Sequence, residues 1–284
     1  MIVEGGPSGH LGLRIGEMAA KLVLVTGASS GIGEATALRY GAAGAHVLLL
    51  ARNAERLYGV AHAIREAGGT ATAFPIDLQG SEATKETAAR IEAESGTPDL
   101  LINNAGAGRW LPLVDTSPEE ARAMMDVPYL AAFNLTRAFA PAMIARGAGG
   151  IVFVTSPASY LAWPNASAYI AARRALAGFA EALQSELKGT GVAVTLVVLG
   201  TVDTPYWDHN PDSLENVPSA NPWLMPTLSP AQAADAIFAG AARKQLFVVK
   251  PAVYRALFVL NALFPKTVAS QLRRAAKKAR ASKG

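Results

Sequence analysis

The chain has 284 residues, no cysteine, a hydrophobic content of 51% and a formal net charge of +4. This length fits one large α/β domain, and no apolar run reaches the roughly 20 residues that span a bilayer. Without cysteine there is no disulfide framework, thiolate metal site or cysteine nucleophile, which is compatible with a reducing compartment. We expect no metal site. From Lys250 onward there are nine Lys or Arg and no Asp or Glu. The preceding part is therefore mildly acidic, which argues against nucleic-acid binding.

The start of the chain is expected to lie outside the folded domain. Residues 1–20 begin with a Gly-rich stretch and lack the apolar core of a secretion signal, which predicts an N-terminal extension. Met18 is a candidate natural start, and a short ordered arm is the open alternative.

Short apolar runs alternate with longer helical patterns along residues 21–250. The runs are rich in Val, Ile and Leu without polar alternation, as expected of strands covered on both faces. The predicted strands are 21–26, 46–50, 71–75, 100–103, 150–155, 193–198 and 246–249. The predicted helices lie near 31–43, 53–67, 81–95, 117–146, 166–188 and 230–242. This alternation predicts one α/β domain with a doubly wound parallel sheet of about seven strands and helices on both faces.

The segment 203–229 breaks this alternation, since it holds five Pro, two Trp and a Tyr. A long irregular insertion is usually functional, so we predict a substrate loop. Because it contains no Lys or Arg, lipophilic alcohols, ketones or aldehydes are favoured over anionic substrates. Packing of the loop on its own body is the open alternative for each apolar side chain. The candidates for an apolar pocket wall are Tyr206, Trp207, Trp223, Leu224 and Met225, with Trp110 and Trp163 nearby.

A glycine-rich turn connects the first predicted strand to the first predicted helix. Residues 26–33 read Thr-Gly-Ala-Ser-Ser-Gly-Ile-Gly. Glycines let the backbone turn sharply and approach a pyrophosphate, which then lies at the positive N-terminus of the helix. The spacing differs from the commoner Gly-x-Gly-x-x-Gly, and an ordinary glycine turn is the alternative. Its place between strand and helix predicts a dinucleotide site.

Residues after the second, third and fourth strands bear on the nucleotide. An acidic residue after the second strand would bind the ribose hydroxyls of NAD(H), but Ala51 and Arg52 stand there. Arg52 offers a fork of donors suited to a 2′-phosphate, which favours NADP(H) unless Arg52 is only a solvated cation. Asp77 is expected to accept from the adenine amino group. The small residues of 103–106, Asn-Asn-Ala-Gly, allow close backbone approach.

Tyr169 and Arg173 lie four residues apart in a predicted helix, and Ser156 lies thirteen residues before the tyrosine. Positions i and i+4 share a helix face, so the guanidinium is expected beside the phenol. A nearby cation favours the phenolate, which an ordinary tyrosine of pKa about 10 scarcely populates at neutral pH. A serine hydroxyl from a strand end would bind a carbonyl or alcohol oxygen. A Tyr and an Arg on a solvated helix face are the simpler interpretation when the pair is taken alone.

Together these motifs resemble the short-chain dehydrogenase/reductase family over residues 21 to about 205. The resemblance rests on Thr-Gly-x-x-x-Gly-x-Gly, Asn-Asn-Ala-Gly and the Ser thirteen residues before Tyr. It implies a Rossmann-type fold in which Ser156 orients the substrate oxygen and Tyr169 exchanges a proton with it. A hydride then passes between the substrate carbon and a nicotinamide ring. The loop 199–204 resembles the one that packs on the nicotinamide, although the family usually has Pro at Leu199.

The resemblance also implies site residues and partners. The catalytic residues are Ser156, Tyr169 and Arg173, and the substrate is a small apolar carbonyl compound or alcohol. A homodimer or homotetramer is expected, with contacts through the helices that hold Pro128 and Tyr169. The implied cofactor-binding residues are Gly27, Ser29, Ser30, Gly31, Ile32, Gly33, Arg52, Asp77, Leu78, Asn104, Ala105, Gly106, Tyr169, Arg173, Gly200, Val202 and Thr204.

Two residues depart from the family pattern. Arg173 stands where the family has Lys, and Pro128 stands where it has a helical Asn. That Lys holds the nicotinamide ribose and passes a proton to a water near the Asn, whereas Arg cannot relay a proton by losing one. Pro128 offers no side-chain amide, would leave the carbonyl of Met124 without its helical partner and would kink the helix. The chain is then an atypical working oxidoreductase or, alternatively, a catalytically impaired nucleotide-binding or scaffold protein.

The tail, residues 251–284, places an apolar stretch before a basic helix. The apolar part is too short to span a membrane, but a basic amphipathic terminus can lie on an anionic bilayer surface. Packing on a partner subunit is the open alternative. We expect a cytoplasmic protein with peripheral membrane contact through this tail, and a membrane-associated interaction module is a third hypothesis.

Overall fold

The computed structural model describes residues 20–281 except 107, 207, 209, 211–212 and 218–224. The predicted N-terminal extension, apart from Ala20, lies outside the described residues. Three of the predicted wall residues, Trp207, Trp223 and Leu224, lie outside them as well.

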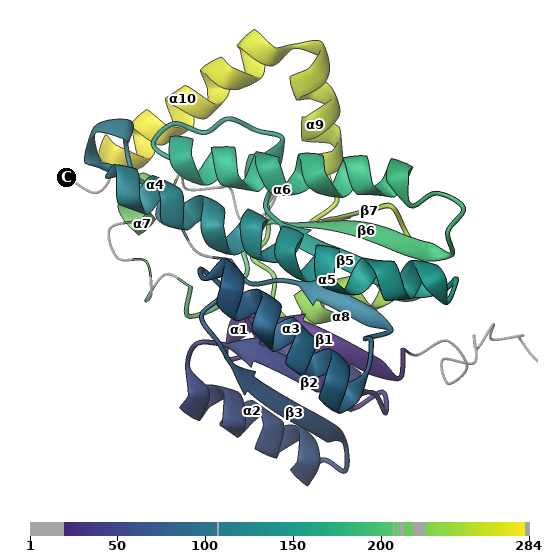
Figure 1. Cartoon of the computed structure of the whole chain (residues 1–284). Helices are drawn as coiled ribbons and strands as arrows, with labels where there is room; N and C mark the ends of the chain where they lie inside the picture. Colours follow the sequence, from purple (N-terminus) through teal and green to yellow (C-terminus); the bar gives the residue numbers. More distant parts are fainter. Residues whose placement is uncertain are drawn as a thin grey trace, which may run out of the picture.

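Seven parallel strands form one sheet in the order β3-β2-β1-β4-β5-β6-β7 (Figure 1). The strands are β1 (Leu22–Thr26), β2 (His46–Ala51), β3 (Thr70–Pro75), β4 (Leu100–Asn103), β5 (Gly149–Thr155), β6 (Val192–Leu199) and β7 (Phe247–Lys250). The chain runs outward from β1 to β3 and then returns to β4 on the other side of β1. This reversal is the topological switch point of a doubly wound sheet, where ligands bind beyond the carboxyl ends of the strands. The predicted fold class is confirmed.

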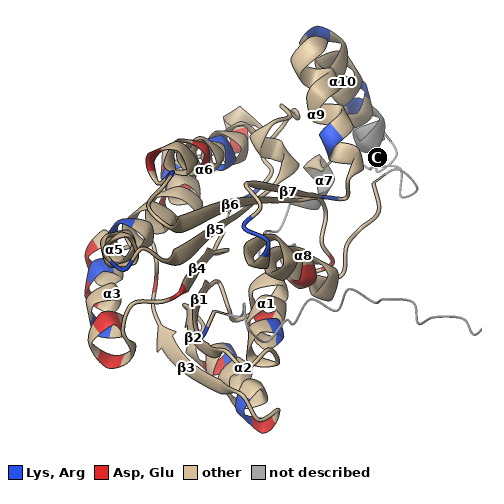
Figure 2. Cartoon of the chain, turned by 90° about the vertical axis from the view of Figure 1, so that its right-hand side faces the viewer, with Lys and Arg blue, Asp and Glu red and all other residues tan. Residues whose placement is uncertain are grey.

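Helices cover both faces of the sheet. Helices α1 (Gly31–Gly41), α2 (Ala54–Glu66) and α8 (Pro230–Ala242) lie on one face, and α3 (Ser81–Ser95), α5 (Ala131–Ala145) and α6 (Ser167–Glu186) lie on the other (Figure 2). The shorter elements are α4 (Pro118–Met125), α7 (Ser213–Asn216) and the 3-10 turns Leu113–Asp115 and Pro157–Ser159. Helices α9 (Val253–Leu263) and α10 (Pro265–Ala281) follow β7. None of the described helices is long and apolar enough to cross a bilayer.

Adjacent residues of each strand belong to two separate cores. In β1, Leu24 packs in the core under α3, α5 and α6, while Val23 and Val25 pack in the core under α1, α2 and α8. In β5, Phe153 and Val152 divide between the two cores in the same way. Because both faces are buried, the strands read as continuous apolar runs without polar alternation, as parallel strands do.

The helix predicted over 117–146 is interrupted at Pro128. Helix α4 ends at Met125, the π-helical turn Asp126–Leu130 follows, and α5 begins at Ala131. Proline has no backbone N–H and its ring clashes with the preceding turn, so the α-helical ladder cannot continue through it. A π-helical turn widens the ladder locally and is frequent at functional sites. Pro128 is buried, and this turn packs against α6.

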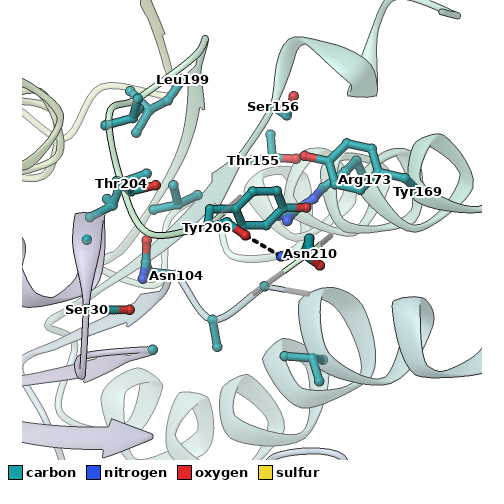
Figure 3. Close-up of a pocket in the computed structure, with 18 of the residues that line it drawn as sticks. Ser30, Asn104, Thr155, Ser156, Tyr169, Arg173, Leu199, Thr204, Tyr206 and Asn210 are labelled. Carbon is teal, nitrogen blue, oxygen red and sulfur yellow. Dashed lines mark hydrogen bonds between the residues drawn. The ribbon is translucent and has the colours of Figure 1, made fainter. Parts of the chain in front are cut away.

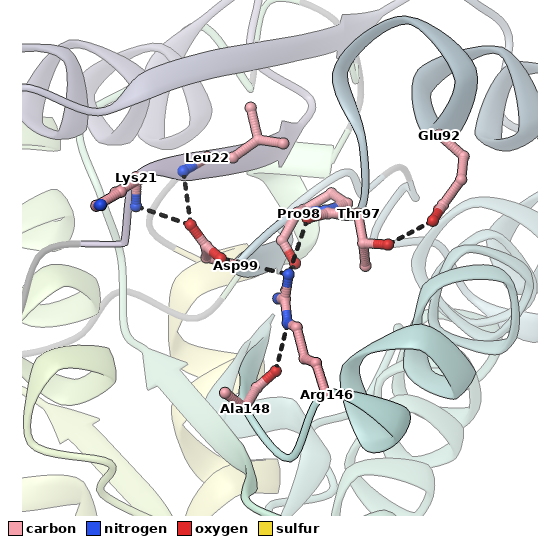
Figure 4. A network of polar contacts seen from close by, with 8 residues as sticks. All are labelled: Lys21, Leu22, Glu92, Thr97, Pro98, Asp99, Arg146 and Ala148. Carbon is pink, nitrogen blue, oxygen red and sulfur yellow. Dashed lines mark hydrogen bonds and ion pairs between the residues drawn. The ribbon is translucent and has the colours of Figure 1, made fainter.

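The amino edge of the sheet, opposite the cavity described below, is held by a carboxylate at the start of β4 (Figure 4). Asp99 Oδ2 accepts hydrogen bonds from the backbone N–H groups of Lys21 (2.9 Å) and Leu22 (3.0 Å). Its Oδ1 lies 3.4 Å from the guanidinium of Arg146. These contacts join the start of β1 to the end of α5 through the residue before β4.

Arg146 also binds three backbone carbonyls. Its Nε donates to Ala148 (2.7 Å), one terminal nitrogen donates to Thr97 (3.1 Å) and the other donates to Pro98 (2.6 Å). A planar guanidinium can serve three acceptors in fixed directions, whereas a lysine ammonium is a point charge on a flexible stem. Arg146 therefore ties the turn before β4 to the turn before β5.

We predict that Arg146→Lys lowers the free energy of unfolding by about 1–2 kcal/mol, because at least two hydrogen bonds to carbonyls are lost. Urea denaturation followed by circular dichroism measures the change. Arg90→Lys is the matched control, since a lysine can keep both the exposed ion pair of Arg90 with Glu94 and its cation–π contact with Phe74, and the midpoint should stay nearly unchanged. An equal response of the two variants would contradict a stabilising role for the Arg146 contacts.

Candidate active site

A cavity of about 960 Å³ lies at the carboxyl edge of the sheet. The turns after six of the seven strands reach it, including Gly27 after β1, Asn104 after β4, Ser156 after β5 and Gly200 after β6. Every residue predicted for the site lines this cavity except Gly33. The sheet topology thus gathers into one space residues that are spread over most of the chain.

Gly33 contributes by packing instead. A Cβ at this position would lie 2.0 Å from the carbonyl oxygen of Gly27 and 2.7 Å from the side-chain nitrogen of Asn104. Helix α1 therefore begins directly under the turn, and only glycine allows this approach. Asn104 Nδ2 in turn donates to the carbonyl of Thr26 (3.0 Å), which fixes the turn after β4 to the end of β1.

The first turn of α1 faces this cavity, and its N-terminal backbone groups are suited to binding an anion. Ser30, at the N-cap, makes no side-chain capping hydrogen bond, and Ser29, Ser30 and Gly31 line the cavity. The first backbone N–H groups of a helix lack helical partners and carry the positive end of its dipole. These residues can hold a pyrophosphate, as in other dinucleotide-binding turns.

Two cations line the same end of the cavity. Arg52 follows β2, and Arg56 lies in the first turn of α2, whose N-terminus is capped by the side chain of Asn53 (2.9 Å). Arg56 was not predicted as a site residue, although a second arginine four residues after the first was a visible signal. Asp77 also lines the cavity, and its Oδ1 accepts from the backbone of Gln79 (3.1 Å).

The loop after β6 closes over the glycine turn. Thr204 lines the cavity and packs on Gly31, where a Cβ would lie 3.0 Å from the Cβ of Thr204. Gly31 has a φ of +56°, so a larger residue there would be strained as well as crowded. Val202 forms a parallel bridge with Leu228, which anchors the loop to the segment before α8.

Tyr169 and Arg173 form a buried pair on α6, near Ser156 and Thr155 (Figure 3). Each side chain is only 7% exposed, and the guanidinium carbon lies 5.0 Å from the centroid of the tyrosine ring. This separation is that of a cation–π contact. The simpler interpretation, a solvated helix face, is therefore wrong for this pair.

Arg173 occupies a tight space beside the turn after β4. A Cβ at Gly106 would lie 2.6 Å from one terminal nitrogen of Arg173 and 3.1 Å from the other, so any larger residue would force the guanidinium to shift. The Nε of Arg173 is buried without a hydrogen-bond partner. A buried unsatisfied donor costs free energy unless a ligand or water pairs with it. This orphaned donor fits a polar ligand, such as a ribose, in the adjoining cavity.

Ser156 directly follows β5 and lines the cavity. Its hydroxyl accepts a hydrogen bond from the backbone of Ala158 (3.3 Å) at the start of a 3-10 turn. Hydrogen bonds hold the residues on either side of Ser156 in place. Thr155 and Ser159 share a hydrogen bond of 2.8 Å, and Ser159 donates to the carbonyl of Arg173 (2.9 Å). The strand end that presents Ser156 is thus attached to the helix that carries Tyr169.

A second phenol lies beside the pair (Figure 3). The hydroxyl of Tyr206 donates to the carbonyl of Gly108, and the amide of Asn210 donates to the backbone carbonyl of Tyr206 (2.7 Å). Burial raises the pKa of Tyr206, Tyr169 acts in the same direction, and the charge of Arg173 opposes both. Tyr206 is therefore a neutral hydrogen-bond donor at physiological pH. The sequence pointed to it only as a candidate for the wall.

Aromatic and aliphatic side chains close the far end of the cavity. Trp110 lies 5.7 Å from the ring of Tyr169 and 6.0 Å from that of Trp163, between ring centroids. Met225 of the loop and Leu272 of α10 line the same space. Among the predicted wall residues, Trp110, Trp163, Tyr206 and Met225 reach the cavity. The role of α10 was missed, because nothing local marks a tail residue that packs against the centre of the chain.

Comparison with known proteins agrees with this geometry. The family model described as short chain dehydrogenase matches residues 21–214. The probable oxidoreductase EphD of Mycobacterium bovis is 31% identical over 281 residues, which are 95% of this chain and 46% of that protein. The chain thus spans about half the length of this relative. A fatty acyl-CoA reductase of Acinetobacter baylyi is 36% identical over 219 residues, 76% of this chain and 71% of that protein.

Among solved structures, a short-chain dehydrogenase from Sphingobium yanoikuyae in complex with NADPH superposes with a TM-score of 0.74 at 26% identity. The alignment covers 89% of this chain and 97% of that one. A doubly wound sheet with a glycine turn at its carboxyl edge, matched by this family model and by a relative solved with NADPH, defines a nucleotide-dependent oxidoreductase. The chain belongs to the short-chain dehydrogenase family.

The contact between Gly106 and Arg173 generates a testable coupling. We predict that Gly106→Ala displaces the guanidinium and weakens NADPH binding, and that the same change has little further effect in an Arg173→Ala background. Residues in direct contact commonly show coupling of about 0.5–3 kcal/mol in such a cycle. Fluorescence titration with NADPH on the four proteins measures it. Additive effects would show that Gly106 acts independently of the arginine.

Proposed function

We propose that the protein is an NADP(H)-dependent oxidoreductase that interconverts a lipophilic alcohol and its ketone or aldehyde. The observation that carries the proposal is that one cavity joins the glycine turn, the Arg52 end, the buried Tyr169–Arg173 pair and an apolar wall. A dinucleotide-sized space that ends at a phenol and a serine hydroxyl suits hydride transfer to or from a small carbonyl group.

The residues around the reacting carbon have separate roles in this proposal. Bound in the cavity, NADP(H) supplies or accepts the hydride. For reduction, the hydroxyl of Ser156 donates a hydrogen bond to the substrate carbonyl, which positions and polarises it. The phenol of Tyr169 gives its proton to the oxygen as negative charge develops there. The guanidinium of Arg173 stabilises the tyrosinate that remains, and oxidation runs the same proton transfer in reverse.

The proton must then reach Tyr169 again by a route that differs from the family's usual one. Arg173 remains charged and cannot pass a proton by losing it, and Pro128 brings no amide. We propose that the cofactor ribose hydroxyl and water carry the proton along the open side of the cavity. Val127, in the π-helical turn, lines the cavity, so this turn can shape the route.

The preference for NADP(H) rests on charge. Arg52 and Arg56 both line the end of the cavity next to β2, and neither strand β2 nor its following turn supplies an acidic residue to that lining. A 2′-phosphate would find two cations there and the N-terminus of α2. The relative solved with NADPH supports this choice.

The apolar wall supports the substrate class. Trp110, Trp163, Met225 and Leu272 present rings and aliphatic groups to the cavity beyond Tyr169. The relative named a fatty acyl-CoA reductase is consistent with a lipophilic substrate.

We further propose a homo-oligomer, supported by the exposed apolar side chains of Leu130 (40%) and Phe133 (37%) near and on α5. A cytoplasmic location suits a chain without cysteine.

Catalysis is tested directly by removing the phenolic hydroxyl. We expect Tyr169→Phe to lower kcat by about 10²–10⁴-fold, the usual contribution of a general acid, with NADPH affinity nearly unchanged. The assay follows NADPH absorbance with a panel of apolar ketones and aldehydes. Tyr58→Phe is the matched control, because Tyr58 is exposed on α2.

One further variant distinguishes the proposed oxidoreductase from the alternative, an impaired nucleotide-binding or scaffold protein. If Arg173→Lys combined with Pro128→Asn turns over these substrates while the parent never does, the parent is a cofactor-binding protein. Turnover by the parent supports the proposal.

Cofactor choice is tested at Arg52. We expect Arg52→Asp to weaken NADPH binding by about 10–100-fold, since charge-assisted hydrogen bonds to the 2′-phosphate are lost. Binding of NADH should improve, because the carboxylate can accept from the ribose hydroxyls. Parallel fluorescence titrations measure both, with Arg90→Asp as a control far from the cavity. An unchanged ratio of the two affinities would remove Arg52 from the basis for NADP(H).

A further inference from the structure

Helix α9 is apolar on two opposite sides. One side packs on the body, where Phe258 lies 4.8 Å from Tyr160 between ring centroids and Asn261 donates to the carbonyl of Tyr160 (3.0 Å). Tyr254, one turn before Phe258 on the same side of α9, is buried. The fold therefore accounts for the apolar residues on this side and fixes the helix in place.

The other side faces outward and ends at the turn into α10. Its large side chains are Val259 (59% exposed), Leu260 (48%), Leu263 (66%) and Phe264 (58%), which we call the apolar apex. Positions 259, 260 and 263 share a helix face, and Phe264 follows at the turn. In Figure 1 this turn projects from the body, away from the sheet.

A surface helix normally carries charged or polar residues on its outer side. Clusters of exposed large apolar side chains mark interaction sites more often than chance, whereas isolated ones need no explanation. The apolar apex gathers four such side chains within six residues, so the observation calls for something that covers it.

The charges around the apex have one sign. Arg255 precedes it on α9, where one terminal nitrogen also donates to the carbonyl of Phe247 (3.4 Å), and Lys266 follows it on α10; both residues are exposed. Further along α10, Arg273, Arg274 and Lys277 are exposed too. In Figure 2 the charged residues drawn on α9 and α10 are all basic, whereas the helices of the body carry both signs.

The apolar side of α10 is already covered. Val268 and Ala276 are buried, and Leu272 and Ala275 line the cavity of the candidate active site. Helix α10 therefore cannot present this side to a bilayer while it forms part of the cavity wall. The membrane contact expected from the sequence must involve α9 and the turn, and leave α10 to contribute its cations.

We propose that the apolar apex docks on an anionic lipid surface. The side chains of Val259, Leu260, Leu263 and Phe264 enter the boundary between headgroups and acyl chains, and Arg255 and Lys266 contact the headgroup phosphates. Interfacial segments combine an apolar face with cations in this way, and their binding depends on anionic lipid. The proposal is independent of the oxidoreductase chemistry.

A second copy of the chain is the less suitable occupant. An isologous contact through the apex would bring two of these cationic segments together, since the same patch meets itself across a two-fold axis. Residues from 250 onward contain no Asp or Glu to offset that repulsion. A negatively charged lipid surface satisfies both the apolar side chains and the cations.

Vesicle flotation with the full chain tests the proposal. We expect binding to vesicles of phosphatidylcholine mixed with phosphatidylglycerol, much weaker binding to phosphatidylcholine alone, and a decrease with added salt. Leu263→Ser with Phe264→Ser should abolish the binding, and Arg255→Gln with Lys266→Gln should reduce it several-fold. The control pair Leu38→Ser and Tyr58→Ser removes exposed apolar side chains on α1 and α2 and should bind as the parent does.

Two results would overturn the proposal. One is binding to anionic vesicles that the serine pair at the apex leaves unchanged. The other is absence of vesicle binding by the parent, with sedimentation velocity showing an oligomer that the same serine pair dissociates, which would assign the apex to a second copy. NADPH titration of each variant reports on the nucleotide site separately, because the apex does not line the cavity.

Discussion

The close contact between two turns at the switch point of the sheet is the constraint on which the site depends. The turn after β1 and the turn after β4 meet so tightly that Gly33 has no room for a Cβ beneath Gly27, and Thr26 Oγ1 accepts from the backbone of Asn104 (3.0 Å) and Ala105 (2.9 Å). This contact sets where α1 begins and where the chain after β4 runs. The contact between the two turns therefore fixes the nucleotide end of the cavity. It also fixes the position of the turn after β4, on which Arg173 packs.

Arg173 extends that constraint to the reacting end. Its guanidinium fills the space that Gly106 leaves open and lies over the ring of Tyr169, so the turn after β4 is coupled to α6 through one side chain. An arginine is larger than a lysine and presents a rigid plane, and it suits this flat space between backbone and ring. The π-helical turn around Pro128 packs against the same helix. Arg173 and Pro128 thus meet at one helix, since Arg173 belongs to α6 and the turn around Pro128 packs on it.

Much of the fold was predictable because a buried parallel strand can be recognised from its own residues, without knowledge of its partners. Buried runs such as 46–50 and 193–198 lie within one residue of the observed strands, since burial on both faces leaves no polar alternation to confuse their limits. The glycine turn and the Ser–Tyr spacing were equally local. The hydrogen-bonding role of Tyr206 and the place of Leu272 in the cavity wall were beyond reach, because both depend on contacts with residues far along the chain. The hydrogen bond from Tyr206 to Gly108 spans 98 positions.

The tail shows how one pair of helices can serve two surfaces. Helix α10 turns its apolar side chains inward, where Leu272 and Ala275 complete the cavity wall, and keeps its cations outside. Helix α9 anchors the pair on Tyr160 and carries the apex outward. The apex and the α10 side chains of the cavity wall therefore belong to two consecutive helices of the tail. If a lipid surface covers the apex, then the cavity wall and the apex both contact apolar molecules. The cavity wall binds such a molecule as a ligand, and the apex rests on a layer of them.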